Sequence, residues 1–177
     1  MKILYLGHEN NKTFFSFLSK FGLVTFHKKK IKLVKLINFE WIISYGYRHI
    51  IDEFSINHSM NPIINLHISY LPFNRGAHPN YWSFKENTPK GVSIHFMNSG
   101  IDTGPILIQK ECFFSDNETL LSSYNKLKLE IENLFYENFE KIIKGKIIPK
   151  PQNNKGTYHS KNQLPSKIDW NEFVKNI

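Results

Sequence analysis

Short apolar runs separated by helical or polar stretches are the feature that most constrains the fold of this chain. Residues 3–6, 23–26, 41–46 and 63–67 each have the character of a buried β-strand, and residues 13–21 carry apolar side chains at helical spacing. Strands that alternate with helices favour a parallel sheet with right-handed crossovers. We therefore predict an α/β fold, a single Rossmann-like domain with a mostly parallel twisted sheet flanked by helices.

The second half of the chain adds further elements to this pattern. Residues 80–86 predict a short helix, and residues 92–97 and 105–113 predict two strands. By contrast, the connection between the second and third strands, residues 26–41, is short, and we expect it to lack a full helix. Residues 149–155 are polar and contain proline, which is typical of a linker or surface loop.

One long helix is predicted after the last strand. Its apolar residues follow one another at alternating four- and three-residue steps, which places them on one face toward the core: Leu120, Tyr124, Leu127, Ile131 and Leu134. Ser115 and Glu118 have the spacing of a capping box at its start, and Gly145 and Pro149 end it.

Composition limits the class of protein. A length of 177 residues with 41% hydrophobic residues suffices for one packed core and excludes global disorder. The single Cys112 fits a reducing cytoplasm, where we expect the protein, and no apolar run has the ~18 residues of a membrane span. The net charge of +8 comes from dispersed lysines, so we interpret it as a basic surface rather than a nucleic-acid groove.

Three polar residues of the central block predict a catalytic site. Asn65 and His67 are two residues apart in a strand, which aims both side chains to one face, and Asp102 follows 35 residues after His67. An amide and an imidazole can donate to the oxyanion of acyl transfer, and a carboxylate can orient the imidazole and accept a proton. Structural roles are the alternative, because a lone histidine and an asparagine before a turn usually serve packing and local hydrogen bonds.

In order and spacing this block resembles the folate-dependent formyltransferase family. The family's Asn-x-His, Ser-x-Leu-Pro, Arg-Gly and Asp-x-Gly elements match Asn65, His67, Ser69, Leu71, Pro72, Arg75, Gly76, Asp102 and Gly104, and residues 91–95 match its Gly-Val-Thr-x-His strand. The resemblance runs from residue 1 to about residue 148. We expect residues 1–148 to form the formyltransferase catalytic domain and residues 149–177 a C-terminal extension on or near the acceptor site.

The resemblance implies the roles of several residues. Asn65, His67 and Asp102 would be catalytic, and N10-formyltetrahydrofolate would be the formyl donor. The positions that match the family's folate-binding loops, largely through backbone groups, are Ser44, Tyr45, Gly46, Tyr47, Met97, Gly100 and Ile101. No metal is expected, because the eight histidines are scattered without ligand-like pairs.

Three classes of acceptor occur in this family. A methionyl-tRNA formyltransferase needs a second, basic domain, and the purine enzyme has a glycine-rich phosphate loop that residues 7–11 lack. Residues 44–51 and 156–161 instead resemble the sugar N-formyltransferases, which act on nucleotide-linked amino sugars, typically 4-amino-4,6-dideoxy sugars destined for surface polysaccharide such as lipopolysaccharide. We therefore expect a nucleotide-linked amino sugar as the acceptor.

The residues expected to contact this acceptor lie in two segments of the chain: Arg75, Gly76, Asn80, Trp82, Tyr158, His159 and Lys161. Each of them also has a packing or surface role as its alternative. A folate- or sugar-nucleotide-binding homologue without turnover is the competing function. The sequence leaves open the sugar, the nucleotide, the position of the amine and whether the protein forms a homodimer.

Overall fold

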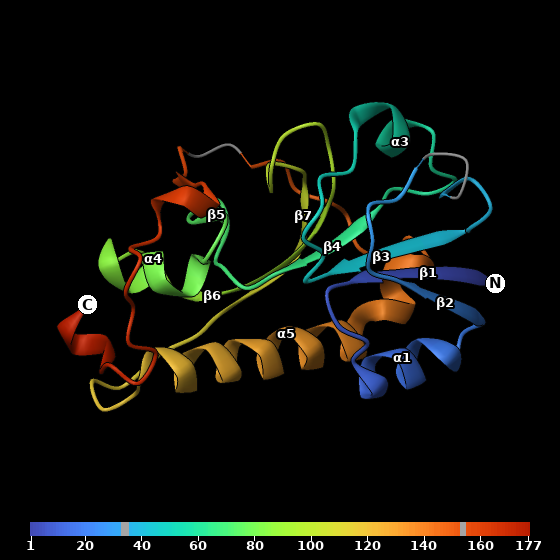
Figure 1. Cartoon of the computed structure of the whole chain (residues 1–177). Helices are drawn as coiled ribbons and strands as arrows, with labels where there is room; N and C mark the ends of the chain where they lie inside the picture. The colour runs from blue at the N-terminus through green and yellow to red at the C-terminus, as the bar shows by residue number, and fades with distance from the viewer. Residues whose placement is uncertain (33–35, 153–154) are drawn as a thin grey trace.

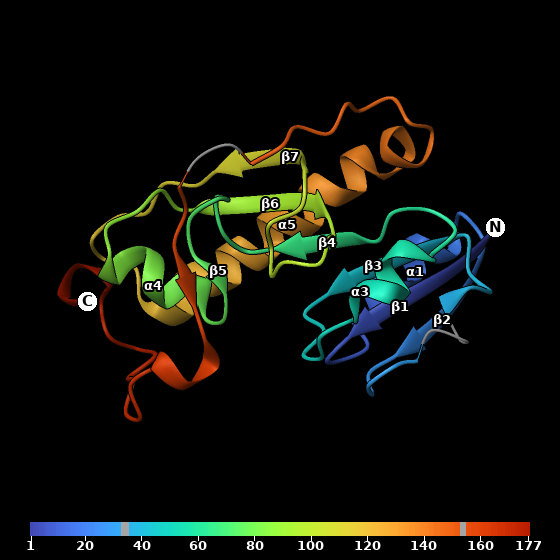
Figure 2. The same ribbon diagram turned by 90° about the horizontal axis from the view of Figure 1, so that it is seen from above.

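The computed structural model describes the whole chain except residues 33–35 and 153–154. Its centre is a six-stranded sheet with the order β2-β1-β3-β4-β6-β7 (Figures 1 and 2). The strands are β1 (Lys2–Gly7), β2 (Leu23–His27), β3 (Trp41–Tyr45), β4 (Ile64–His67), β6 (Gly91–Phe96) and β7 (Ile106–Glu111). The first four are mutually parallel, whereas β6 pairs antiparallel with β4 and β7 pairs antiparallel with β6. The predicted α/β fold with a mostly parallel sheet is confirmed.

Two helices cover one face of the sheet. Figure 1 shows α1 (Lys12–Ser19) and the long α5 (Leu120–Ile143) on the same side. Phe14 of α1 stacks on Phe135 of α5 with ring centroids 5.0 Å apart, and both rings are fully buried. Burying one such aromatic side chain stabilises the fold by about 2 kcal/mol. The buried cluster of this layer is the larger of the two cores.

The opposite face is divided into an apolar and a polar half. Over β1 and β3, the side chains of Leu4, Leu6 and Ile42 are covered by Leu36 and Ile51. A short helix that the sequence analysis did not predict, α3 (Glu53–Asn57), lies on this side (Figure 1). The prediction that the crossover lacks a full helix falls partly on residues 33–35, which lie outside the described residues.

The start of α5 differs from the prediction. The capping box is formed by Thr119 and Ser122, which exchange bonds of 3.1 and 2.9 Å, and Glu118 instead pairs with Lys126 at 3.3 Å. The helix therefore begins later than the Ser115 pattern indicated. Leu120, Leu127, Ile131 and Leu134 are buried as expected, but Tyr124 is 38% exposed and Ser123 is buried in its place.

The last residues return across the molecule. The backbones of Lys150 and Ile106 exchange hydrogen bonds of 2.7 and 2.8 Å. The short strand β5 (Arg75–Gly76) precedes α4 (Pro79–Lys85) in the chain. It pairs in parallel with β8 (Tyr158–His159), which belongs to this last segment. Two short 3-10 turns follow, η1 (Lys161–Gln163) and η2 (Val174–Asn176). In the described part of the chain, none of the helices has the length and apolar character that a membrane crossing requires.

Candidate active site

Strand alternation builds a polar surface over β4 and β6. Asn65 and His67 of β4 pair in register with His95 and Ser93 of β6, while the residues between them face α5. Since side chains alternate along a strand, these four polar groups share the face opposite α5. The sequence analysis expected Asn65 and His67 in a strand with both side chains on one face, and the structure places them so. Both lie within β4, so the site is on the face of the sheet.

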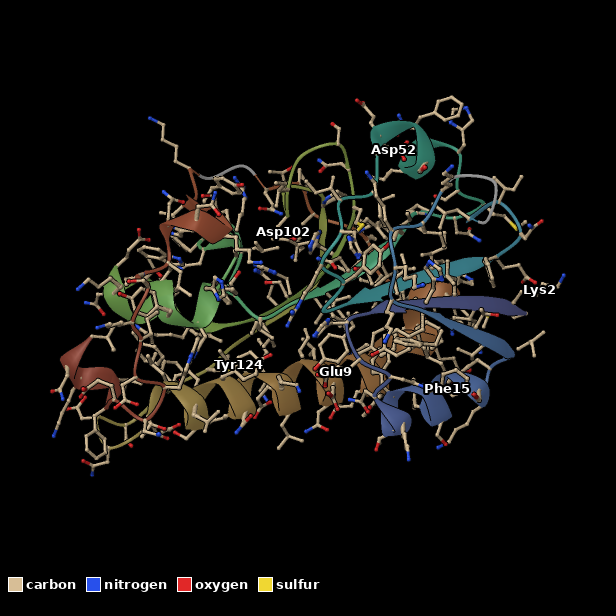
Figure 3. The ribbon with its side chains drawn as sticks, viewed as in Figure 1. Lys2, Glu9, Phe15, Asp52, Asp102 and Tyr124 are labelled. Carbon is tan, nitrogen blue, oxygen red and sulfur yellow. The ribbon has the colours of Figure 1, made fainter. Side chains whose placement is uncertain are left out.

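Asp102 lies over this polar surface. Figure 3 shows it on the side of the sheet opposite α5, on the loop between β6 and β7. One carboxylate oxygen accepts from Asn65 Nδ2 at 3.1 Å, and the other accepts from the backbone N–H of Gly76 at 2.8 Å. His67 Nδ1 and His95 Nε2 lie 3.6 and 3.5 Å from these oxygens. The structure thus brings the three predicted catalytic residues together around one carboxylate.

The environment keeps Asp102 ionised. Its side chain is only 12% exposed, and burial alone would raise the pKa of the carboxyl group. The charge of His67, the contact with His95 and the N–H of Gly76 outweigh burial and hold the pKa of Asp102 well below its ordinary range. A buried carboxylate between two imidazole rings is therefore a stable feature of the site.

His95 is a site residue to which the sequence analysis gave no role. Its Nδ1 faces the carbonyl of Phe96 at 2.8 Å, so Nδ1 carries the hydrogen and Nε2 can accept from Asn65 Nδ2 at 3.0 Å. The two amide hydrogens of Asn65 are thus directed to His95 and Asp102. The alternation of Ser93 and His95 in an apolar strand was the signal that could have indicated this role.

Asn74 is a second residue that the sequence analysis missed. Its carbonyl lies 3.0 Å from His67 Nε2, its backbone N–H donates to Thr157 Oγ1 at 2.8 Å, and its side chain exchanges bonds with Thr88. It is fully buried with φ 57°, a left-handed conformation that asparagine tolerates better than most residues. Its partners are distant in the sequence, so no local pattern reveals it.

The aromatic side chains expected at the folate loops are used inside the fold. Tyr45 donates to Glu132 at 2.8 Å, and burial together with this carboxylate raises the pKa of Tyr45 well above its ordinary value. Tyr47 donates to the carbonyl of Lys29 at 2.7 Å and accepts from the N–H of Ile31. We therefore assign both rings to packing. A ligand that binds at this segment would then contact its backbone.

The other expected folate positions flank the site. Ser44 is buried and pairs with Asn65, and Gly46 is exposed with φ 66°, where a side chain would be strained. Met97 directly follows β6, and Gly100 and Ile101 are exposed on the loop that carries Asp102. These two loops border the polar surface on the sides of β3 and β6.

The expected acceptor residues differ in exposure. Trp82 and His159 stack on each other with centroids 4.0 Å apart, and His159, 7% exposed, also faces Glu86 at 3.1 Å. Tyr158 and Lys161 are exposed on the same segment of the chain. The structure therefore leaves these last two open to a ligand, whereas the stacked pair packs within the fold.

The two remaining positions, Arg75 and Gly76, lie beside the carboxylate of Asp102. The guanidinium of Arg75 donates to Gln152 Oε1 at 3.2 and 2.7 Å. Gly76 has φ 87°, and a Cβ there would lie 2.4 Å from the carbonyl oxygen of His159. Glycine is thus required at this position so that its N–H can reach Asp102 while β8 packs against it.

Asn80 serves the fold rather than a ligand. Its side chain is 3% exposed and donates to the carbonyl of Leu120 at 2.9 Å and to Ser123 Oγ at 3.1 Å. We expect Asn80→Ala to lower the free energy of unfolding by about 1–3 kcal/mol, because buried partners lose their bonds. Chemical denaturation measures this effect, with the exposed Asn162→Ala as control. A raised acceptor KM at unchanged stability would return Asn80 to the binding site.

The match to known families agrees with this geometry. Residues 19–138 match the family model described as formyl transferase. Because the match covers more than half of the chain, the chain belongs to the formyl transferase family, and the resemblance predicted from its motifs is confirmed.

Among solved structures, the chain is similar to the formyltransferase PseJ from Anoxybacillus kamchatkensis. The two are 42% identical with a TM-score of 0.91, over 99% of this chain and 96% of that one. PseJ was solved in complex with UDP-4,6-dideoxy-4-formamido-L-AltNAc and tetrahydrofolate. An N-formyltransferase from Helicobacter canadensis shares the fold at 21% identity, with a TM-score of 0.81 over 96% of this chain and 75% of that one.

Among curated proteins, the chain is similar to methionyl-tRNA formyltransferase from Thermodesulfovibrio yellowstonii. They are 35% identical over 149 residues, which is 83% of this chain and 48% of that protein. The chain thus spans about half the length of the curated relatives it matches.

Proposed function

We propose that this protein transfers the formyl group of N10-formyltetrahydrofolate to the amine of a nucleotide-linked amino sugar, most specifically a UDP-linked 4-amino-4,6-dideoxy sugar. The observation that carries this proposal is the 42% identity to PseJ over nearly the full length of both chains. A 4-formamido sugar and tetrahydrofolate, the ligands of PseJ, are the two products that such a transfer would leave.

The reaction requires one attack and one proton transfer. The amine nitrogen attacks the formyl carbon, and the carbonyl oxygen of the formyl group becomes negatively charged in the tetrahedral intermediate. The bond from that carbon to N10 then breaks, the amine loses a proton and N10 gains one. Preorganised donors near the oxygen lower the barrier, and losing one donor typically costs roughly a hundredfold to a thousandfold in rate.

The polar surface over β4 supplies these groups. Asn65 Nδ2 can donate to the oxyanion by exchanging one of its present bonds to His95 or Asp102. His67 donates from Nε2 to the carbonyl of Asn74 and faces the carboxylate with Nδ1, a geometry that fits an imidazolium. Its charge would further stabilise the oxyanion. Asp102, ionised and partly exposed, would accept the proton of the amine directly or through water.

The placement of both substrates follows from the surroundings of this surface. The pterin would bind along the backbone of residues 44–47 and 97–102, which border Asn65 on both sides. The sugar nucleotide would lie toward β5 and β8, where the exposed Tyr158 and Lys161 could stack on a base or pair with phosphate. The formylated sugar would then serve the synthesis of a surface polysaccharide.

The start of α1 argues against a phosphate-bearing purine precursor as the acceptor. Asn11 caps this helix by accepting from the N–H of Phe14, and its amide donates to Glu132 at 2.9 Å. A phosphate at this position would meet the carboxylate of Glu132, and like charges repel. Methionyl-tRNA remains the second candidate acceptor, because the 35% identical relative from Thermodesulfovibrio yellowstonii carries that name.

A panel of acceptors tests the proposed function. With N10-formyltetrahydrofolate as donor, we expect the release of tetrahydrofolate with a UDP-linked 4-amino-4,6-dideoxy sugar and a formamide in the sugar product by mass spectrometry. A dTDP-linked 4-amino sugar and a UDP-linked sugar without an amine test the nucleotide and the nucleophile. Glycinamide ribonucleotide and methionyl-tRNA should give background rates. Efficient use of either one would overturn the sugar assignment.

A further inference from the structure

We propose that Gln152 is a positioning residue for formyl transfer, which holds the Asp102 loop against β5 without touching either substrate. The inference rests on the proposed function for its kinetic consequences only. Gln152 belongs to the C-terminal extension, and the sequence analysis gave it no role. The proposal follows from the contacts that its carboxamide makes.

The carboxamide of Gln152 bridges two segments of the site. Its Nε2 donates to the backbone carbonyls of Asp102 at 3.0 Å and of Gly104 at 2.7 Å. Its Oε1 accepts from Nε and from a terminal nitrogen of Arg75 at 3.2 and 2.7 Å. The reversed amide would set oxygen against two carbonyls and nitrogen against a guanidinium. The orientation of the side chain is therefore fixed by its partners.

These bonds close a ring around the catalytic carboxylate. Gln152 holds the backbone of Asp102 and the side chain of Arg75, while the next residue, Gly76, donates its N–H to the Asp102 carboxylate at 2.8 Å. Asp102 has φ 51°, a conformation that is uncommon for residues other than glycine and needs support from its surroundings. Gln152 supplies that support from a part of the chain fifty positions away.

A positioning role follows from how fully the side chain is used. Both amide hydrogens donate to the loop, and the oxygen accepts two charge-assisted bonds, so Gln152 has no hydrogen left for a substrate. A displacement of the carboxylate by about 1 Å can cost roughly a hundredfold in rate. Loss of Gln152 should therefore lower kcat and leave substrate binding nearly unchanged.

Two substitutions separate the halves of the carboxamide. Gln152→Met keeps the length of the side chain and removes all its bonds, whereas Gln152→Glu keeps the Arg75 contact and sets a carboxylate against the two carbonyls. We expect both variants of the full chain to lose kcat by about ten- to a hundredfold, with each KM within about twofold of the intact protein. Gln163→Met, an exposed position on η1, is the control. A raised acceptor KM at unchanged kcat, or a Gln152→Glu variant with normal kcat, would overturn the proposal.

A second measurement does not depend on the identity of the acceptor. The carboxyl carbon of Asp102 can be followed by ¹³C NMR during acid titration. If Gln152 holds the carboxylate in place, Asp102 should protonate at a higher pH in Gln152→Met than in the intact protein, and Gln163→Met should show no change. Identical titration in all three proteins would overturn the proposal. If the intact protein formylated no sugar while this shift was present, only the proposed function would fail.

Discussion

Asp102→Asn is expected to lower kcat for formyl transfer at least about a hundredfold. The substitution preserves the shape of the side chain but removes the charge that lies 3.6 Å from His67 and 3.5 Å from His95. It also removes the group that would accept the proton of the amine. His67→Asn should have an effect of similar size, because the imidazole that lies between Asp102 and the carbonyl of Asn74 is lost.

Steady-state kinetics with saturating donor and acceptor measures this effect. Asp116→Asn is the matched control, since it makes the same chemical change at an exposed position away from the site. Circular dichroism and the thermal midpoint of each variant establish that the fold is intact. A variant that is folded and keeps near-normal kcat would remove that residue from the mechanism.

The same substitution should change how stability depends on acid. The pKa of Asp102 is lower in the folded protein than in the unfolded chain, so its ionised form stabilises the fold at neutral pH. This contribution decreases only as the pH falls below the ordinary carboxyl value, roughly pH 4. Asp102→Asn should therefore lose less stability than the intact protein on going from roughly pH 5 to pH 3.

Deletion of residues 150–177 is expected to reduce turnover at least about a hundredfold and to lower the thermal midpoint, since it removes supports of the site and of α5. Gln152 holds the Asp102 loop, and Thr157 holds Asn74, whose carbonyl contacts His67. The deletion also removes the backbone carbonyls of Trp170 and Glu172, which accept from the first N–H groups of α5.

A shorter deletion separates the two supports. Removal of residues 164–177 takes away the partners of α5 but keeps Gln152, Thr157 and β8. We expect this variant to have a lower thermal midpoint and to retain measurable turnover at low temperature. Both deletion variants can be compared with the intact chain, their thermal midpoints by differential scanning fluorimetry and their turnover by tetrahydrofolate release. If the longer deletion were stable and fully active, the C-terminal extension would be dispensable for the site. The division at residue 148 would then describe two independent parts.

Much of the scaffold could be predicted from the sequence because it depends on neighbours in the chain. Apolar runs gave the positions of β1, β3 and β4, and the two-residue spacing of Asn65 and His67 placed both on one face. The apolar stripe of α5 was also predicted, except at Tyr124, whose place toward the core is taken by Ser123 because that residue bonds Asn80. These features follow from the geometry of single helices and strands.

What only the tertiary structure decided is how distant segments meet. The residues that hold the catalytic groups, among them His95, Asn74 and Gln152, are joined to their partners by hydrogen bonds between strands and loops far apart in the sequence. Asn80 looked like a ligand contact, but its side chain is buried and bonds Leu120 and Ser123. Local periodicity fixes which face a side chain is on. Which groups meet there depends on the order of the strands and the path of the loops, and both are set by the packing of the whole chain.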